Sequence, residues 1–238
     1  MRRLFLFSTM VLLGTLLSSC FFMGPSVKGN GEVRSEERKV EDFSGVSVTS
    51  GMNVELIQGE TQGVRVVADA NLHKLIETRV ENGVLEIRAL ANIWKANEKK
   101  VVVTVKDLKE ISGTAGSNIT TGNKLVAGEL EIHGSAGSNL RLEIDGQLVD
   151  LTASSGANIR LDGTTRELKV KTSSGANIKA GGFLTSACEA NASSGGNMWV
   201  AVQNELSADA SSGGNIFYQG TPSEININTS SGGNIIKK

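Results

Sequence analysis

The sequence predicts an all-β protein, a parallel β-helix (β-solenoid) of about seven turns of 18–21 residues, preceded by an N-terminal antiparallel β cap. Three observations predict this fold. Segments such as Ala153–Ile159 (ASSGANI) and Thr229–Ile235 (TSSGGNI) recur about every nineteen residues, apolar and polar residues alternate between them, and hairpin signals precede the first repeat. A short fixed period of alternating strands is typical of a solenoid.

Residues 1–19 have the features of a bacterial lipoprotein signal peptide. Two arginines at positions 2 and 3 precede the short apolar run Leu4–Leu17, which is too short for a membrane span. The following Ser18-Ser19-Cys20 resembles the end of a lipobox. We therefore expect Cys20 to be lipidated and to become the mature N-terminus; the alternative is an ordinary signal peptide, with Cys20 as a spare thiol.

Residues 20–39 are expected to form the lipid anchor and a tether, because the stretch after Cys20 is short and rich in Gly and Ser. This predicts a membrane partner through the lipid and a place in the cell envelope, as an outer-membrane lipoprotein that faces either the periplasm or the cell surface. If Cys20 carries lipid, Cys188 has no partner and no disulfide is expected.

Residues 40–110 lack the regular repeats of the later chain and are expected to form the N-terminal β cap. Phe43–Gly59 (FSGVSVTSGMNVELIQG) is an irregular first copy of the repeat, and Asn71–Glu77 could be helical. Asn82-Gly83 lies between alternating residues of Arg79–Ala89, which is a strong hairpin signal. Together with the strand expected at Val101–Val105, these segments predict an antiparallel layer over the N-terminal edge of the solenoid.

Residues 111–238 hold the repeats. The same asparagine recurs in each at spacings of 21, 19, 19, 20, 18 and 19 residues: Asn118, Asn139, Asn158, Asn177, Asn197, Asn215 and Asn234. A glycine always lies two positions earlier and a large aliphatic residue one position later. Seven and nine positions earlier, the residues are apolar in nearly every repeat, with a polar residue between them, which is strand alternation with one buried face.

The recurring Ser-Gly-x-Asn segment is expected to be a structural corner. The glycine predicts a positive φ or a close approach to the neighbouring turn. The seven asparagines are expected to stack in register as a structural ladder of side-chain amides, and the serines to satisfy backbone groups or to form a second ladder. A phosphate-binding loop would occur once, before a helix, and calcium-binding repeats would need aspartates here.

Two positions after each asparagine, an outward column is predicted to carry Thr120 and then a contact stripe of three basic and three large apolar residues: Arg141, Arg160, Lys179, Trp199, Phe217 and Ile236. Contiguous exposed apolar side chains are uncommon on soluble proteins and indicate a contact surface. The alternative is a face covered by a loop or by a second protomer.

No catalytic group, metal site or cofactor site is predicted. His73 and His133 stand alone, and no nucleophile, zinc or dinucleotide motif occurs. Removing residues 1–19 takes away two arginines, so the formal charge changes from −1 to −3 (22 basic against 25 acidic residues), which argues against a nucleic-acid partner. The outward column with Glu110, Glu131, Asp150, Lys169 and Glu189 keeps a polysaccharide-acting enzyme as a remote alternative.

The lipobox-like leader, the FSGVSV segment and the repeated S-x-G-x-N-I turns resemble the GIN-domain family of auto-transporter adhesin heads, over residues 40–238. The resemblance implies an exported, often lipid-anchored β-solenoid of Bacteroides-like bacteria and transfers no ligand residue. The resulting hypothesis is a non-enzymatic, adhesin-like envelope lipoprotein with a protein or glycan ligand. The alternative is a self-assembling envelope protein whose C-terminal edge and contact stripe pair with copies of itself in a homo-oligomer, unless Lys237-Lys238 blunt that edge.

Overall fold

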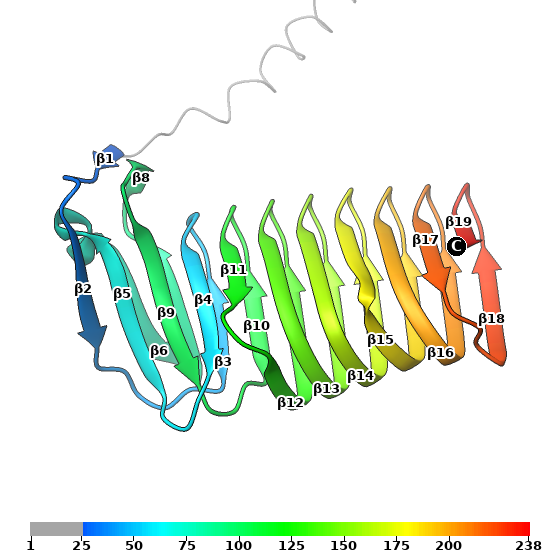
Figure 1. The fold of residues 1–238 in the computed structure, drawn as a ribbon. Coiled ribbons are helices and arrows are strands. Elements are labelled where there is room, and N and C mark those ends of the chain that lie inside the picture. Colours follow the sequence, from blue (N-terminus) through cyan, green and yellow to red (C-terminus); the bar gives the residue numbers. More distant parts are fainter. Residues whose placement is uncertain (1–25) are drawn as a thin grey trace, which may run out of the picture.

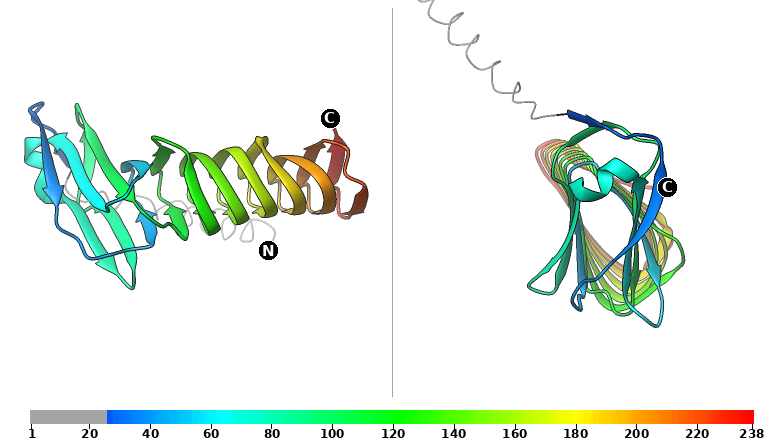
Figure 2. Two further views of the ribbon diagram at one scale, coloured as in Figure 1. Left: turned by 60° about the horizontal axis from the view of Figure 1, so that its bottom comes forward. Right: turned by 90° about the vertical axis from the view of Figure 1, so that its left-hand side faces the viewer.

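The computed structural model describes residues 26–238 as one elongated rod of stacked β-coils (Figure 1). The expected signal peptide and Cys20 lie outside the described residues. Viewed along the rod, the coils stack behind one another as a flattened ring (Figure 2). The predicted all-β solenoid is confirmed.

The coils of the repeat region are built from ten strands. Each long strand runs along one face of the rod, bends round the lower edge in Figure 1 and returns along the other face to the next corner. The strands are β10 (Glu110–Gly113), β11 (Asn118–Thr121), β12 (Leu125–Gly134), β13 (Asn139–Ala153), β14 (Asn158–Thr172), β15 (Asn177–Ala192), β16 (Asn197–Ala210), β17 (Asn215–Gln219), β18 (Glu224–Thr229) and β19 (Asn234–Lys237).

Neighbouring coils pair in parallel in the register that the repeat predicts. Asn139 lies opposite Asn158, which lies opposite Asn177, and the pairing continues coil by coil to Asn234. Within the repeats, register shifts occur between Arg160 and Asp162 of β14 and between Ala180 and Ala187 of β15. Differences in coil length are therefore absorbed between the corners, while the corners stay aligned.

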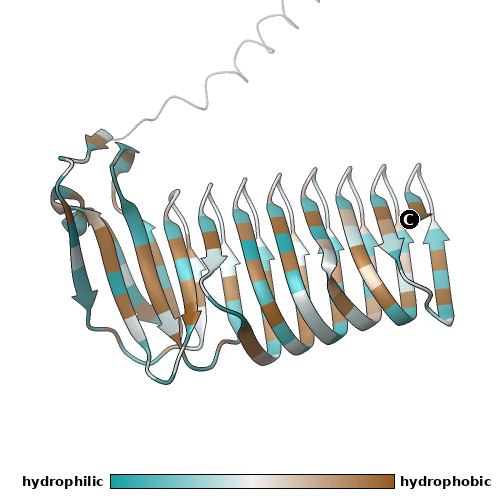
Figure 3. Ribbon diagram, in the orientation of Figure 1, coloured by the Kyte–Doolittle hydropathy of each residue, from teal (hydrophilic) through white to brown (hydrophobic). Residues whose placement is uncertain are grey.

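The interior is a single apolar core that runs the length of the rod, and apolar and polar residues alternate along its strands (Figure 3). The two predicted apolar columns are buried in the central coils, as Leu168 and Val170 show. The last coil differs, because no further coil covers it: Ile225 is 48% exposed and Ile227 is 43% exposed.

Each corner is a tight turn with two consecutive residues at positive φ. In the corner that starts at Ser154, φ is 49° at Ser155 and 72° at Gly156, and the N–H of Ala157 donates to the carbonyl of Ser154 at 3.0 Å. Two positive φ values in sequence define a type I′ turn. The predicted positive φ of the glycine is confirmed. A Cβ on Gly156 would meet no atom within 4 Å, so the backbone conformation, not crowding, favours glycine there.

Backbone hydrogen bonds join each corner to the next. The N–H of Gly156 donates to the carbonyl of Ser174 on the following coil at 3.1 Å, and the N–H of Ser154 donates to the carbonyl of Gly134 on the preceding coil at 2.9 Å. Equivalent bonds recur along the rod. The serine ladder is not general: the described hydroxyl pair at the corners is Ser135 with Thr114, at 3.1 Å.

The asparagine ladder forms, but with an interruption. Amide-to-amide bonds of 2.9–3.3 Å link Asn158, Asn177, Asn197, Asn215 and Asn234 in order. A separate bond of 3.0 Å joins Asn118 to Asn53 of the first coil. Asn139 donates to the carbonyl of Gly137 at 3.4 Å, as the asparagines of the next four corners do to their own glycines, but no bond within residues 26–238 joins its amide to either neighbour in the ladder. The uninterrupted ladder expected from the sequence is therefore wrong at this coil.

Where two neighbouring corners touch, the facing residues are small, and which of the two corners supplies the glycine changes along the rod. In the first half of the rod, Gly134 faces Ala157, whose Cβ lies 3.4 Å from the place that a Cβ on Gly134 would take. In the second half, glycine lies on the other side of the contact. A Cβ on Gly214 would lie 2.5 Å from the backbone of Ala192. Each corner therefore fits the corner beside it.

The N-terminal region contains a coil at Phe43–Gly59, where the sequence predicted an irregular first copy of the repeat, but the next strands stack on this coil in parallel and not as the predicted antiparallel cap. Its strands β3 (Gly45–Val48) and β4 (Asn53–Gln58) pair in parallel with β10 and β11, and β7 (Val84–Ala89) and β9 (Lys99–Val105) stack in parallel on their other side. Hydrophobic alternation is alike in both pairings, so the pattern alone could not decide between them.

Antiparallel pairing is confined to the outermost strands. β5 (Gly63–Asp69) pairs with β9 and with β2 (Val33–Arg38), and β6 (Ile76–Glu81) pairs with β7. The last pair is the predicted Asn82-Gly83 hairpin, with φ of 52° and 78°. The 3₁₀ helix η1 (Ala70–Leu75) occupies most of the stretch expected to be helical. β1 (Ser26–Lys28) and β8 (Asn92–Lys95) form a separate two-stranded sheet beside the cap.

A buried carboxylate ties the N-terminal strand to the cap. Asp69 is 1% exposed and accepts hydrogen bonds from the backbone N–H groups of Gly31 (2.9 Å), Asn97 (3.2 Å) and Glu98 (3.1 Å). Burial by itself raises the pKa of Asp69, but the three N–H donors outweigh it and hold the pKa below its usual value. Asp69 therefore stabilises the fold in its charged form.

This arrangement predicts acid sensitivity that depends on Asp69. Because its folded pKa lies below its unfolded value of about 3.9, its contribution is present at neutral pH and is lost as the pH falls through the folded value. We expect Asp69→Asn to lower the urea midpoint at neutral pH and to reduce the loss of stability between neutral pH and about pH 3. Parallel pH profiles of the variant and the original chain would contradict this account.

The corner contact predicts a steric penalty. Gly214→Ala is expected to lower the free energy of unfolding by about 1–3 kcal/mol, because the added methyl group meets the backbone of Ala192 and forces a shift. Gly63→Ala is the matched control, since a Cβ there meets nothing within 4 Å, and its effect is expected to stay within about 0.5 kcal/mol. Equal effects of the two substitutions in urea unfolding would refute the close contact.

Cys188 is predicted to be inert in the native protein. Burial raises the pKa of its thiol to about 12, and the nearby carboxylate of Glu189 adds to the rise, so very little reactive thiolate is present at neutral pH. In a Cys20→Ser chain, we expect a maleimide to leave Cys188 unmodified until denaturant is added. Labelling at the same rate with and without denaturant would contradict this expectation.

Candidate functional site

The parallel register brings the residues of the contact stripe into one continuous row. Two positions after the corner asparagine, each side chain alternates outward and lies directly opposite its counterpart on the next coil. In order along the rod, the residues are Arg141, Arg160, Lys179, Trp199, Phe217 and Ile236. The strands β13 to β17 and β19 therefore place three cations next to three apolar side chains on one face.

The apolar half of the stripe is ordered by stacking. The rings of Trp199 and Phe217 have centroids 5.0 Å apart and an interplanar angle of 15°, and both are partly exposed. The ammonium of Lys238 lies 5.1 Å from the centroid of Phe217, within cation–π distance. Ile236 continues the row and is 42% exposed. No loop in the described part of the chain covers this end of the face.

The basic half of the stripe lines a shallow groove of about 250 Å³. Its walls are formed by Arg141, Arg160 and Lys179 together with the ladder residues Asn139, Asn158 and Asn177. The guanidinium of Arg160 donates to Asp162 at 2.8 and 3.2 Å, and this bond holds the pKa of Arg160 above its usual value. Within residues 26–238, Arg141 and Lys179 form no ion pair, so their charges face solvent.

Tyr218 does not join the stripe. The register of its coil on the preceding one is regular, and Tyr218 points inward opposite Val200, with only 7% of its surface exposed. Its backbone carbonyl accepts a hydrogen bond from the N–H of Lys238 at 2.9 Å. This bond fixes the last residue next to Phe217, a contact that the sequence repeat could not predict.

The opposite face carries the acidic column. Glu110, Glu131, Asp150, Lys169 and Glu189 lie opposite one another on successive coils, as expected. His133 is near Glu131, with 3.6 Å between its Nε2 and the carboxylate. Across residues 26–238, no three His, Cys, Asp or Glu side chains are grouped in a way that could hold a metal ion.

His73, the other histidine, belongs to the cap. It is 4% exposed, its Nε2 lies 3.2 Å from the carbonyls of Arg34 and Ala68, and its Nδ1 lies 3.3 Å from Glu36. These contacts join η1 to β2. The two histidines are on different elements and do not form a joint site.

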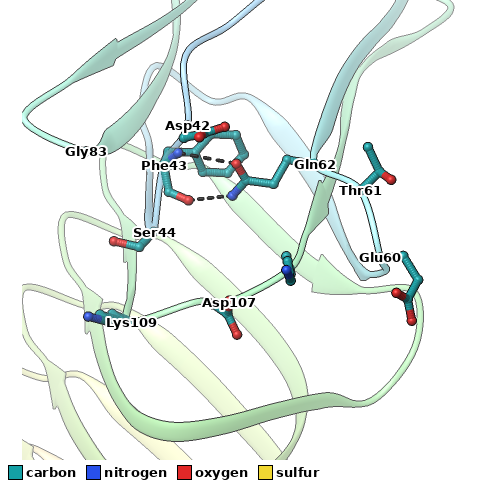
Figure 4. A pocket seen from close by; sticks show the side chains of 10 residues that line it. Asp42, Phe43, Ser44, Glu60, Thr61, Gln62, Gly83, Asp107 and Lys109 are labelled. Carbon is teal, nitrogen blue, oxygen red and sulfur yellow. Dashed lines mark hydrogen bonds between the residues drawn. The ribbon is translucent and has the colours of Figure 1, made fainter.

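A larger hollow of about 590 Å³ lies where the cap meets the solenoid (Figure 4). The amide of Gln62 bridges the backbone of Phe43 in both directions, accepting from its N–H and donating to its carbonyl. The carboxylates of Asp42, Glu60 and Asp107 lie apart around its rim, and they do not converge on a common point. The hollow is therefore a junction between loops without a chemical centre.

The sequence predicted an open C-terminal edge, but it did not predict which core side chains this edge exposes. Ile225 and Ile227 occupy inward positions in the repeat, so the pattern predicts that they are buried. They are exposed because the stack ends there, and only the position of the final repeat in the chain could have signalled this.

Solved structures with the same fold come from Bacteroides and Parabacteroides species. A "putative adhesin" of Bacteroides fragilis superposes with a TM-score of 0.81 at 19% identity, covering 89% of this chain and all of that one. A "putative lipid binding protein" of Parabacteroides distasonis and a "putative adhesin" of Parabacteroides merdae give 0.69 and 0.68, each at 19% identity with 90% of this chain and all of the other covered.

No curated protein matches the chain in sequence. The described residues contain no helix of the length and apolarity needed to cross a bilayer. A family profile matches residues 42–222, which is more than half of the chain and includes the first coil and most of the repeats. The adhesin label suggests a place in the envelope or at the cell surface. The chain thus belongs to the family described as "Putative auto-transporter adhesin, head GIN domain".

Proposed function

We propose that this protein is a non-enzymatic, adhesin-like lipoprotein that is anchored in the outer membrane through lipid on Cys20 and binds a protein or glycan ligand along its contact stripe. The observation that carries this proposal is the continuous row from Arg141 to Ile236 on one face of the rod. Five steps between adjacent strands at about 4.8 Å give the row a length of about 24 Å. This length suits an extended ligand.

The side chains of the row determine which chemical groups a ligand would need in order to bind there. The unpaired Arg141 and Lys179 favour an anionic segment, and the outer surface of the Trp199–Phe217 pair favours a flat apolar or sugar face. The adjacent asparagine amides add donors and acceptors along the groove. The adhesin label of the family and of two of the compared structures agrees with a binding role.

A binding screen on a glycan and matrix-protein array tests this proposal. We expect Trp199→Ala with Phe217→Ala to lose binding while the mass from light scattering and the unfolding profile stay those of a folded protein. Val126→Ala is the control, because Val126 is 62% exposed and lies outside the stripe. Binding that survives in the double variant, or is lost equally in the control, would rule out the stripe as the ligand site.

Self-assembly is the second candidate, favoured by the uncovered last coil. Ile225 and Ile227 expose core side chains, and β18 has a free backbone edge that could pair with another copy. If this candidate is correct, the original chain is an oligomer by light scattering, Ile227→Lys makes it a monomer, and no array ligand is found. A monomeric original chain would exclude it.

A further inference from the structure

The small sheet of β1 and β8, here called the flap, exposes an aromatic side chain beside the start of the described chain. Val27 and Ile93 lie opposite each other and pack against the core, so the flap has one buried side. Trp94 on β8 is 60% exposed, and Leu90, just before β8, is 55% exposed. The chain has only two tryptophans. Trp199 stacks on Phe217, whereas Trp94 has no stacking partner among the described residues.

The length of chain before the flap restricts where it can be. Five residues, 21–25, separate Cys20 from Ser26. A fully extended chain advances at most about 3.6 Å per residue, so Ser26 cannot lie more than about 22 Å from Cys20. If Cys20 carries lipid, as the proposed function requires, the start of the flap stays within about 22 Å of the lipid anchor and can reach the bilayer surface.

The charges around the flap suit a lipid surface. Lys28 and Lys95 are exposed and lie opposite each other in the parallel register. The nearby acidic groups are already engaged: Asp69 by backbone N–H groups, and Glu32 by Arg34 at 2.7 Å. Lysines are attracted to anionic lipid headgroups, and tryptophan prefers the interface between headgroups and acyl chains.

We infer that the flap is a membrane-contacting surface, in which Trp94 and Leu90 enter the lipid interface and Lys28 and Lys95 face anionic headgroups. A protein partner fits less well, because two apolar side chains bury far less than the roughly 1,200 Å² of a stable protein interface. A tethered surface needs only weak affinity, since the anchor keeps its local concentration high. This inference rests on the proposed lipid anchor.

Depth-dependent fluorescence quenching tests the inference on the full lipidated protein. The protein is reconstituted into phosphatidylethanolamine and phosphatidylglycerol vesicles that contain lipid brominated near the headgroup. Trp199→Phe leaves Trp94 as the single reporter, and Trp94→Phe leaves Trp199 as the matched control. We expect the lipid environment to blue-shift the emission of Trp94 and the brominated lipid to quench it, with the emission of Trp199 unchanged.

Two outcomes would overturn the inference, and they can be told apart by flotation. If the protein floats with the vesicles but Trp94 is not quenched more than Trp199, the flap does not touch lipid, while the anchor stands. If the protein does not float with the vesicles at all, the lipid anchor fails and the inference falls with it. Urea unfolding midpoints equal to that of the original chain show that both variants are folded.

Discussion

The alignment of the corners is the constraint on which the rest of the structure depends. Each corner places two residues at positive φ and bonds through its backbone to the corners on either side, as Gly156 does with Ser174. A strand that slipped by one residue would turn its buried side chains to solvent. Because the corners cannot slip, differences in coil length are absorbed between them, and the residues next to each corner stay aligned with their counterparts on the neighbouring coils.

The contact stripe is a direct result of this alignment of the corners. A side chain two positions after the asparagine points outward on every coil, so substitution at one repeat position changes one point in a straight row. The same alignment places Trp199 directly opposite Phe217, so the two rings stack with a centroid separation of 5.0 Å, close to the spacing of neighbouring strands. The fold thus sets a regular spacing along the surface, and each coil contributes one side chain to the row.

The repeat made the solenoid and the stripe predictable, because both follow from a period and an alternation that are local in sequence. The features that escaped prediction depend on contacts between distant segments. Asp69 is held by amides near residues 31 and 97, and no spacing in the sequence signals that bond. The parallel pairing of β3 and β4 with β7 and β9 escaped for the same reason. The period of the repeat also did not predict the break in the ladder at Asn139.

The change along the rod in the residues that face each other between corners limits how coils could be added to the protein by duplication. A corner with alanine at position 157 rests on Gly134, whereas Gly214 rests on Ala192. A coil copied from the second half into the first would leave a void, and the reverse copy would collide with backbone. Although the repeats look alike, the coils are not interchangeable. A duplicated coil is expected to fit only when it is inserted next to the coil from which it was copied.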